Sequence, residues 1–306
     1  MTVRYVRPVS HSAYAASRIG LAALLLFVLA VIAHRFGPLR TPDFLALVLL
    51  SAAIAAAAVP LALIGLARLW QKGADGGIAS AKALVYAGVP LGVVAAGVVL
   101  YLTQPPLYDV STDIDNPPAF LATPHYDQQW LVRSAFPSPM DRQEQLDAYP
   151  GLAGRRYEGA LDRVFEGVKA AALSARIEIV KQEGVELAQP HPEPAEQPAA
   201  PAEEAAPGEG PLPLDNIPIP LPRPEPLLAA PLLAAPGDVL LQGEAETLVF
   251  GLPFDIIIRL QEDAETTSVD VRVASRYGPH DLGMSAAVAD DFLKRLDTEL
   301  LGIAGG

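Results

Sequence analysis

The chain has no cysteine among its 306 residues. This absence excludes disulfides, thiol nucleophiles and thiolate metal sites. Histidine is also scarce: the five histidines are scattered, and no two lie three or four residues apart, so a histidine-based metal site is not expected. The GxSxG, Walker and GxGxxG patterns are missing too. Serine hydrolase, nucleotidase and dinucleotide-binding functions therefore lack their usual sequence support, and we expect no cofactor.

Basic residues are rare in one part of the chain. Residues 1–103 carry eight Lys and Arg against two Asp, whereas residues 104–306 carry fourteen Lys and Arg against thirty-three Asp and Glu. The overall charge of −13 therefore averages a basic segment and a strongly acidic one. Because an acidic domain repels phosphate backbones, nucleic-acid binding is not expected.

Ionisable residues are absent from three apolar runs: 19–33, 44–67 and 83–102. A helix of about 20 residues crosses the roughly 30 Å hydrocarbon core of a bilayer, so the second and third runs are long enough and the first is short. The first run could instead be a cleaved signal peptide. Two further spans follow it directly, which favours an uncleaved helix. We predict a membrane domain over residues 1–103, with helices at about 18–34, 43–68 and 82–103.

The basic residues of the membrane half predict its orientation. Three arginines precede the first run, and Arg68, Lys72 and Lys82 separate the second from the third. On the other side, only Arg35 and Arg40 separate the first run from the second, and neither Lys nor Arg occurs between residues 104 and 132. The positive-inside rule then places the N-terminus in the cytoplasm and the C-terminal domain in the periplasm, across a bacterial inner membrane. Without an internal charge, the spans alone are not expected to transport ions. Gly88 and Gly92, four residues apart, could allow close packing with another helix.

Residues 104–306 read as one soluble domain with a proline-rich insertion. Fifteen of the thirty prolines lie between residues 188 and 237. This composition predicts a disordered segment, and the flanking segments are each too small to form a core alone. Its proline runs could also serve as a polyproline II ligand for a partner.

The rest of this domain alternates between helical and strand patterns. Apolar spacing predicts a helix at about 155–173 and a closing helix around residues 289–300, where Asp290 and Asp291 stand four residues before a base. Four strands are expected between these helices: 176–183, 239–250, 254–261 and 268–277. The order predicts an α+β fold, with three N-terminal transmembrane helices followed by an antiparallel four-stranded sheet and two helices packed on one of its faces.

One strand register follows from the side chains. If Leu260 faces Val269, the apolar residues of both strands share one face and Arg259 faces Asp270 on the other. A slip by one residue would bring apolar side chains onto the polar face, and a slip by two would set Arg259 opposite Arg272. The first register is therefore expected.

Several segments resemble the bacterial domain-of-unknown-function family 1499. They are "YDVSTDIDNPPAF" from Tyr108, "YPGL" from Tyr149, "DRVFEGV" from Asp162, "FDIIIRL" from Phe254 and "VDVRVASRYGPHDLGMSAA" from Val269. The resemblance covers about residues 107–300 apart from the insertion, and it implies a bacterial envelope or membrane-associated domain without an assigned activity. Many relatives carry Asn where this chain has Ser285; either residue caps a helix well, so we expect Ser285 to cap the closing helix.

Two polar clusters are candidate sites. Asp109, Asp113 and Asp115 could offer oxygen ligands to Ca²⁺, although Asx turns before Pro117 explain the same residues. The second cluster surrounds the turn after the last strand, and its candidate binding residues are Asp255, Arg272, Arg276, His280 and Asp281. They could form a carboxylate and guanidinium set for a ligand, or a salt-bridge network at a structural joint.

We therefore expect an envelope protein whose membrane-anchored periplasmic domain is a binding or scaffolding module rather than an enzyme. Its expected partners are the lipid bilayer and an envelope protein. The alternatives are a periplasmic hydrolase or lyase with an aspartate base and an arginine anion clamp, and an accessory subunit of an inner-membrane complex.

Overall fold

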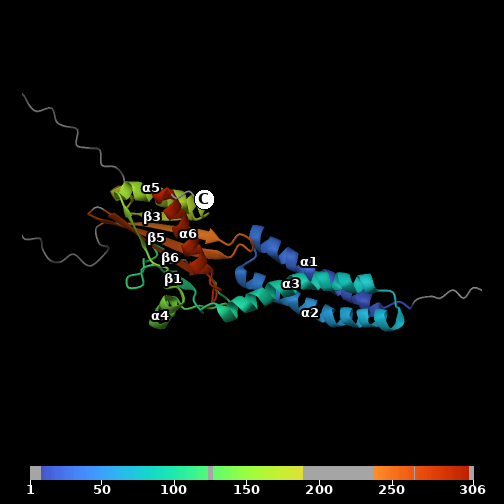
Figure 1. The fold of residues 1–306 in the computed structure, drawn as a ribbon. Coiled ribbons are helices and arrows are strands. Elements are labelled where there is room, and N and C mark those ends of the chain that lie inside the picture. Colours follow the sequence, from blue (N-terminus) through green and yellow to red (C-terminus); the bar gives the residue numbers. More distant parts are fainter. Residues whose placement is uncertain (1–7, 123–126, 189–236, 265, 303–306) are drawn as a thin grey trace, which may run out of the picture.

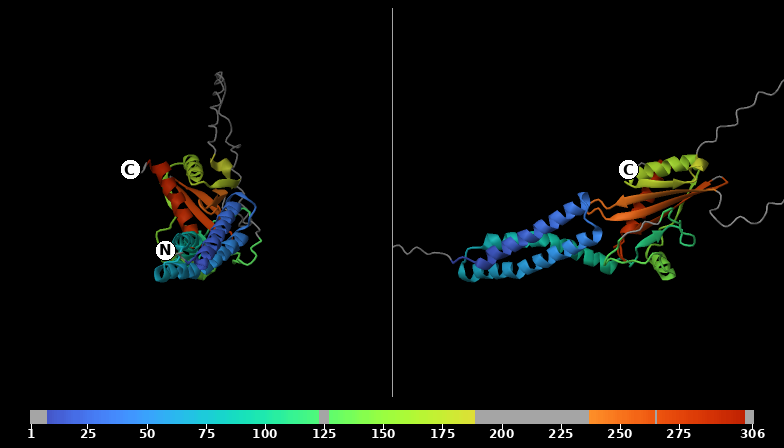
Figure 2. Two further views of the ribbon diagram at one scale, coloured as in Figure 1. Left: turned by 90° about the vertical axis from the view of Figure 1, so that its right-hand side faces the viewer. Right: turned by 180° about the vertical axis from the view of Figure 1, so that it is seen from behind.

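The molecule is elongated, with a three-helix bundle and an α+β domain lying end to end (Figures 1 and 2). A computed structural model of the chain describes residues 8–122, 127–188, 237–264 and 266–302. All but the two end residues of the predicted proline-rich insertion lie outside these described residues.

The bundle confirms the three predicted apolar helices. They are α1 (His11–Phe36), α2 (Thr41–Lys72) and α3 (Gly77–Thr103), and each is long and apolar enough to cross a membrane. The first uncharged run is short, but α1 continues beyond it at both ends and reaches 26 residues. Its length is therefore sufficient for a span.

Small side chains hold the bundle together. Ala23, Ala55 and Ala87 form one buried cluster between the three helices, and a second alanine cluster lies nearer to the N-terminus. Because alanine has a short side chain, the helix backbones approach closely. Gly88 and Gly92 lie on the exposed side of α3, where an added Cβ would meet no described atom within 4 Å. They are not used for packing between the described helices, and an interface with another helix stays a prediction.

The second part of the chain is an α+β domain with an antiparallel sheet, as predicted, but the sheet has six strands rather than four. Its elements are β1 (Asp109–Ser111), α4 (Pro139–Ala148), β2 (Arg155–Glu158), α5 (Leu161–Ser174), β3 (Glu178–Glu183), a short 3-10 helix (Val185–Ala188), β4 (Asp238–Glu246), β5 (Pro253–Asp263), β6 (Thr266–Ser275) and α6 (Met284–Leu301). The strand order is β1-β6-β5-β4-β3, and β2 also pairs with β6. Two short strands therefore share the outer edge of β6.

The predicted register of the central strands is confirmed. Leu260 pairs with Val269 and Arg259 pairs with Asp270. The apolar side of these strands forms the core together with residues of α5 and α6, among them Val168 and Phe292. On the exposed side of α6, both predicted i, i+4 ion pairs are present, at 2.6 Å and 2.8 Å.

The predicted elements were wrong in three places. Residues 155–158 form strand β2 rather than the start of a helix, because Tyr157 lies four residues before Leu161 and so imitates helical spacing. Tyr157 is buried as a strand residue, and its hydroxyl donates to Asp297 of α6 at 2.7 Å. Strand β4 ends at Glu246, and residues 247–252 turn towards the bundle. The domain also contains α4, which had not been predicted.

Candidate functional site

A segment that we call the arch, residues 112–122, crosses the polar side of the sheet directly after β1. Arg259 of β5 holds its middle: the guanidinium donates to the carboxylates of Asp113 (2.7 Å) and Asp270 (3.0 Å) and to the Asn116 carbonyl (3.0 Å). The side chain of Arg259 is only 5% exposed. Burial by itself lowers the pKa of Arg259, but the hydrogen bonds with Asp270 and Asp113 outweigh it and the pKa is raised. Arg259 is therefore a charged structural group under the arch.

The neighbouring Arg272 holds the arch from β6. It donates to both carboxylate oxygens of Asp109, with a shortest distance of 2.7 Å, and to the Pro118 carbonyl at 3.0 Å. Its guanidinium also lies 5.0 Å from the centre of the Phe120 ring, within the range of a cation–π contact. Arg142 of α4 reaches Asp109 from the other side at 3.0 Å. One buried carboxylate thus connects β1, β6, α4 and the arch.

The ends of the arch are fixed by hydrogen bonds to the strands beneath it. Thr112 exchanges two hydrogen bonds with Val271, both of 2.9 Å, and Ala122 exchanges two with the buried amide of Gln242. In addition, the Gln145 side chain joins α4 to Ser111 at the end of β1. The polar residues of the arch and of the strands beneath it serve one structural purpose: they hold this segment on the sheet.

The calcium candidates lie apart in this arrangement. Asp109 faces two arginines and Asp113 faces Arg259, while Asp115 is exposed. Among the described residues, no three His, Asp or Glu side chains are grouped so that they could hold a metal ion.

The structure brings together only part of the second predicted cluster. Arg276 lies 2.8 Å from the carboxylate of Asp255 and 2.6 Å from that of Glu244. Arg272 turns away to Asp109. His280 stacks on Tyr101 of α3, with ring centres 4.7 Å apart, and its Nε2 lies 3.1 Å from the Tyr101 carbonyl oxygen. Two of the five predicted residues therefore make an ion pair with each other, and His280 joins the turn to the end of α3.

Asp281 acts at the start of α6. It is buried, and its carboxylate accepts hydrogen bonds from the backbone nitrogens of Gly283 and Ser285, both at 2.8 Å. Gly283 is the N-cap residue and adopts a φ of 78°, which suits glycine. The prediction that Ser285 caps α6 was wrong: Ser285 lies inside the first turn, and Asp281 satisfies the free donors in its place. The family-like turn therefore has a structural explanation.

A charged pocket lies beside Arg276, between the end of α1 and the sheet. It has a volume of about 250 Å³, and its charged lining comes from three arginines and three glutamates: Arg35, Arg176, Arg276, Glu178, Glu244 and Glu246. Arg35 of α1 forms an ion pair with Glu246 of β4. This pocket therefore opens where the domain meets the membrane helices.

Arg176 is the unusual residue of this pocket. It follows the last turn of α5 with a φ of 59°, and the bonds Arg176 N to Leu173 O and Ile177 N to Ala172 O complete a Schellman motif. Glycine usually occupies this position, because a positive φ costs other residues about 1–2 kcal/mol. Arg176 is exposed and makes no ion pair with a described residue. Sequence reasoning missed this residue because it placed Arg176 at the start of a strand.

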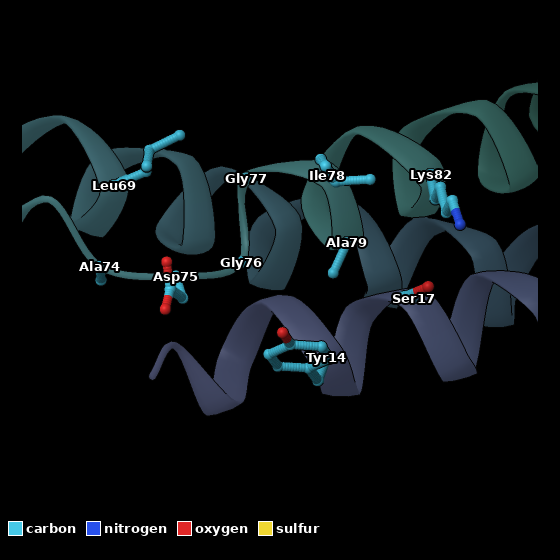
Figure 3. A pocket seen from close by; sticks show the side chains of 10 residues that line it. All are labelled: Tyr14, Ser17, Leu69, Ala74, Asp75, Gly76, Gly77, Ile78, Ala79 and Lys82. Atoms are coloured by element: carbon cyan, nitrogen blue, oxygen red, sulfur yellow. The ribbon is translucent and has the colours of Figure 1, made fainter. Parts of the chain in front are cut away.

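A larger cavity, of about 670 Å³, lies at the opposite end of the bundle. Figure 3 shows that its lining comes from α1, from the turn after α2 and from the start of α3. Asp75 and Lys82 are its charged residues. None of the residues predicted as a site lines this cavity.

Comparison with known proteins agrees with the resemblance drawn from the sequence. Residues 233–296 match the family described as "Protein of unknown function (DUF1499)". The match spans β4, β5 and β6 and most of α6, and so includes Asp255, Arg259, Arg272 and Arg276. No curated protein and no solved structure matches the chain.

Proposed function

From the DUF1499 match and the three apolar helices, we propose that this is an inner-membrane protein whose periplasmic domain is a binding module. Six Lys and Arg flank the apolar helices at the end of the N-terminus and of the turn between α2 and α3, against two, Arg35 and Arg40, at the end of the α+β domain. This excess supports a cytoplasmic N-terminus and a periplasmic domain. The ion pair between Arg35 and Glu246 supports a domain that is seated on the bundle rather than loosely tethered to it.

One observation carries the binding role: Arg176, which has a positive φ, lines a pocket that also contains carboxylates. A side chain kept in a strained backbone conformation is more common at functional sites than elsewhere. Three guanidinium groups and three glutamates suit a small ligand with both charges, such as an amino acid or the headgroup of a zwitterionic lipid. The pocket volume of about 250 Å³ fits a ligand of that size.

The geometry supports an enzyme less well. A hydrolase or lyase would need an accessible aspartate base near an anion clamp. The side chain of Asp255 is 4% exposed and is paired with Arg276, and Asp281 is bonded to the start of α6. His280 lies against Tyr101 and does not line the pocket.

The topology is tested with reporters fused after Gly306. We expect alkaline phosphatase to be active there and a cytoplasm-dependent fluorescent protein to be dark, because the positive-inside rule exports this end. The same reporters fused after Gly73, in the turn between α2 and α3, should give the opposite result. A C-terminal fusion that is active only in the cytoplasm would contradict the proposed localisation.

Ligand binding is tested on the full-length protein in detergent, by its melting temperature in the presence of amino acids, glycerophosphoethanolamine and glycerophosphoglycerol. We expect a zwitterion to raise the melting temperature and Arg176→Gln to abolish this shift. Arg163→Gln is the matched control, because it removes the same charge from the other end of α5, outside the pocket. A shift that survives Arg176→Gln would exclude this pocket as the site.

Arg176→Gly separates binding from folding. The unliganded protein should gain about 0.5–1 kcal/mol in free energy of unfolding, because glycine adopts a positive φ without strain. The ligand-induced shift should still be lost. Gain of stability together with loss of binding is the result expected of a residue kept for function.

A further inference from the structure

The hairpin between β4 and β5 has an apolar tip. Residues 247–252 read Thr-Leu-Val-Phe-Gly-Leu, and Leu248 and Val249 are 67% and 66% exposed. Hairpin turns in water are usually built from Gly, Asn, Asp and Ser, whose side chains are small or polar. Two adjacent exposed aliphatic residues at such a turn therefore indicate that its surroundings are apolar.

The structure fixes this tip to the ends of α1 and α2. The Phe250 carbonyl oxygen lies 2.6 Å from Nδ1 of His34, and the Phe250 ring lies 6.1 Å from that of Phe44. Phe250 and Leu252 pack on the apolar cluster at this end of the bundle, which includes Phe27. Gly251 lies so close to Arg35 that an added Cβ would come within 3.0 Å of its side chain. Figures 1 and 2 show the two strands reaching the end of α1.

The uncharged length of α1 indicates where the tip lies relative to a bilayer. Between Arg18 and His34, the uncharged part of α1 has 15 residues. It therefore rises only about 22 Å, less than the roughly 30 Å of a hydrocarbon core. The edge of the hydrocarbon should then fall at or beyond His34, the residue that contacts Phe250. Val249 and Leu248 are one and two residues from Phe250, within about 7 Å along the chain.

We propose that the β4–β5 tip is a second membrane anchor, and that Leu248 and Val249 insert into the leaflet on the side of the α+β domain. The nearby half of α1 also exposes apolar side chains, among them Val28, Leu29 and Ile32. Insertion of the tip sets the orientation of the α+β domain relative to the bilayer. The charged pocket, which Leu248 also lines, then lies at the level of the lipid headgroups. This inference requires no ligand in the pocket.

The absence of cysteine makes the test direct. Single-cysteine variants Leu248→Cys and Val249→Cys of the full-length protein are labelled with an environment-sensitive fluorophore and placed in phosphatidylethanolamine–phosphatidylglycerol vesicles. Leu187→Cys is the matched control: Leu187 is also aliphatic and is 52% exposed, but it follows the end of β3 that lies away from the pocket. Val28→Cys, within the uncharged part of α1, gives the reference quenching of a label that is surrounded by lipid.

We expect the labels at 248 and 249 to behave like the label at 28. Lipids with a spin label on the acyl chain should quench them several-fold more than the label at 187, and aqueous iodide should quench them several-fold less. If iodide reaches the labels at 248 and 249 as readily as the label at 187, the tip lies in water and the inference is overturned. A zwitterion-induced shift in melting temperature would still support the pocket in that case, so the two proposals fail separately.

Discussion

Replacing Arg259 with leucine is expected to cost the α+β domain about 3–5 kcal/mol in free energy of unfolding, the usual penalty for removing one partner of a buried ion pair. The change leaves Asp270, whose side chain is 13% exposed, without its guanidinium partner and the Asn116 carbonyl without its donor. Urea titration of the full-length protein in detergent, read by limited proteolysis, measures this loss. Hydrogen exchange of residues 112–122 should also speed up, because Arg259 holds the middle of the arch.

Arg156→Leu is the matched control for this experiment. Arg156 also pairs with an aspartate across two strands, Asp263 at 3.4 Å, but both side chains are more than 60% exposed. Exposed pairs contribute about 0–1 kcal/mol, so this variant should remain close to the parent. Equal losses for Arg156→Leu and Arg259→Leu would show that the arch is not held by Arg259.

A double-mutant cycle measures how much of this free energy comes from the contact between Arg259 and Asp270. Asp270→Asn and Arg259→Leu should couple by at least about 1 kcal/mol, because the two residues touch. Exchanging the two charges should rescue stability only in part, since the new carboxylate at 259 would face Asp113. Full additivity would contradict the predicted register contact.

The sequence predicts the centre of the sheet well because local side-chain patterns determine it. Alternation of apolar residues fixes which face of β5 and β6 is buried, and the pair Arg259 and Asp270 selects one register among the possible slips. The same reasoning placed Arg276 near Asp255, and the two form an ion pair. Contacts between neighbouring strands in the chain are accessible to this kind of argument.

Contacts between distant segments are not accessible in this way. Strands β1 and β2 have three and four residues, too few for an alternating pattern to appear. Asp109 pairs with Arg272, which is 163 residues away, and no local feature of either residue indicates the other. Arg176 was misread because its role depends on where α5 ends. Helix ends are among the least reliable boundaries in a sequence-based prediction.

The structure also changes the meaning of the family-like motifs. "STDIDNPPAF", which suggested metal ligands, forms the arch, and Arg259 and Arg272 hold it on the sheet. The "SRYGPHDLG" turn starts α6 and contacts α3. The residues that first drew attention are therefore committed to the fold. The charged pocket is lined largely by residues that carried no motif, such as Arg35 and Arg176.

Asp109→Asn should be as damaging as the loss of Arg259. The Asp109 side chain is 2% exposed and is the common partner of Arg272 and Arg142, whose side chains are 11% and 12% exposed. Without the negative charge, two largely buried guanidinium groups lose their carboxylate partner, and we expect a loss of about 3–5 kcal/mol. Because Arg142 belongs to α4, protease cleavage within α4 should accelerate together with hydrogen exchange in the arch. Both are measured on the full-length protein in detergent.

Asp115→Asn provides the control from the same motif. Asp115 is exposed, so its change should stay within about 0.5 kcal/mol of the parent. Comparing the Asp109→Asn and Asp115→Asn variants also shows whether these aspartates hold the arch or form a calcium site. If the three aspartates bound Ca²⁺, millimolar Ca²⁺ would raise the melting temperature of the parent and both variants would weaken that shift. We expect no Ca²⁺ shift, because arginines already neutralise Asp109 and Asp113, so the damage from Asp109→Asn should be the same with or without Ca²⁺.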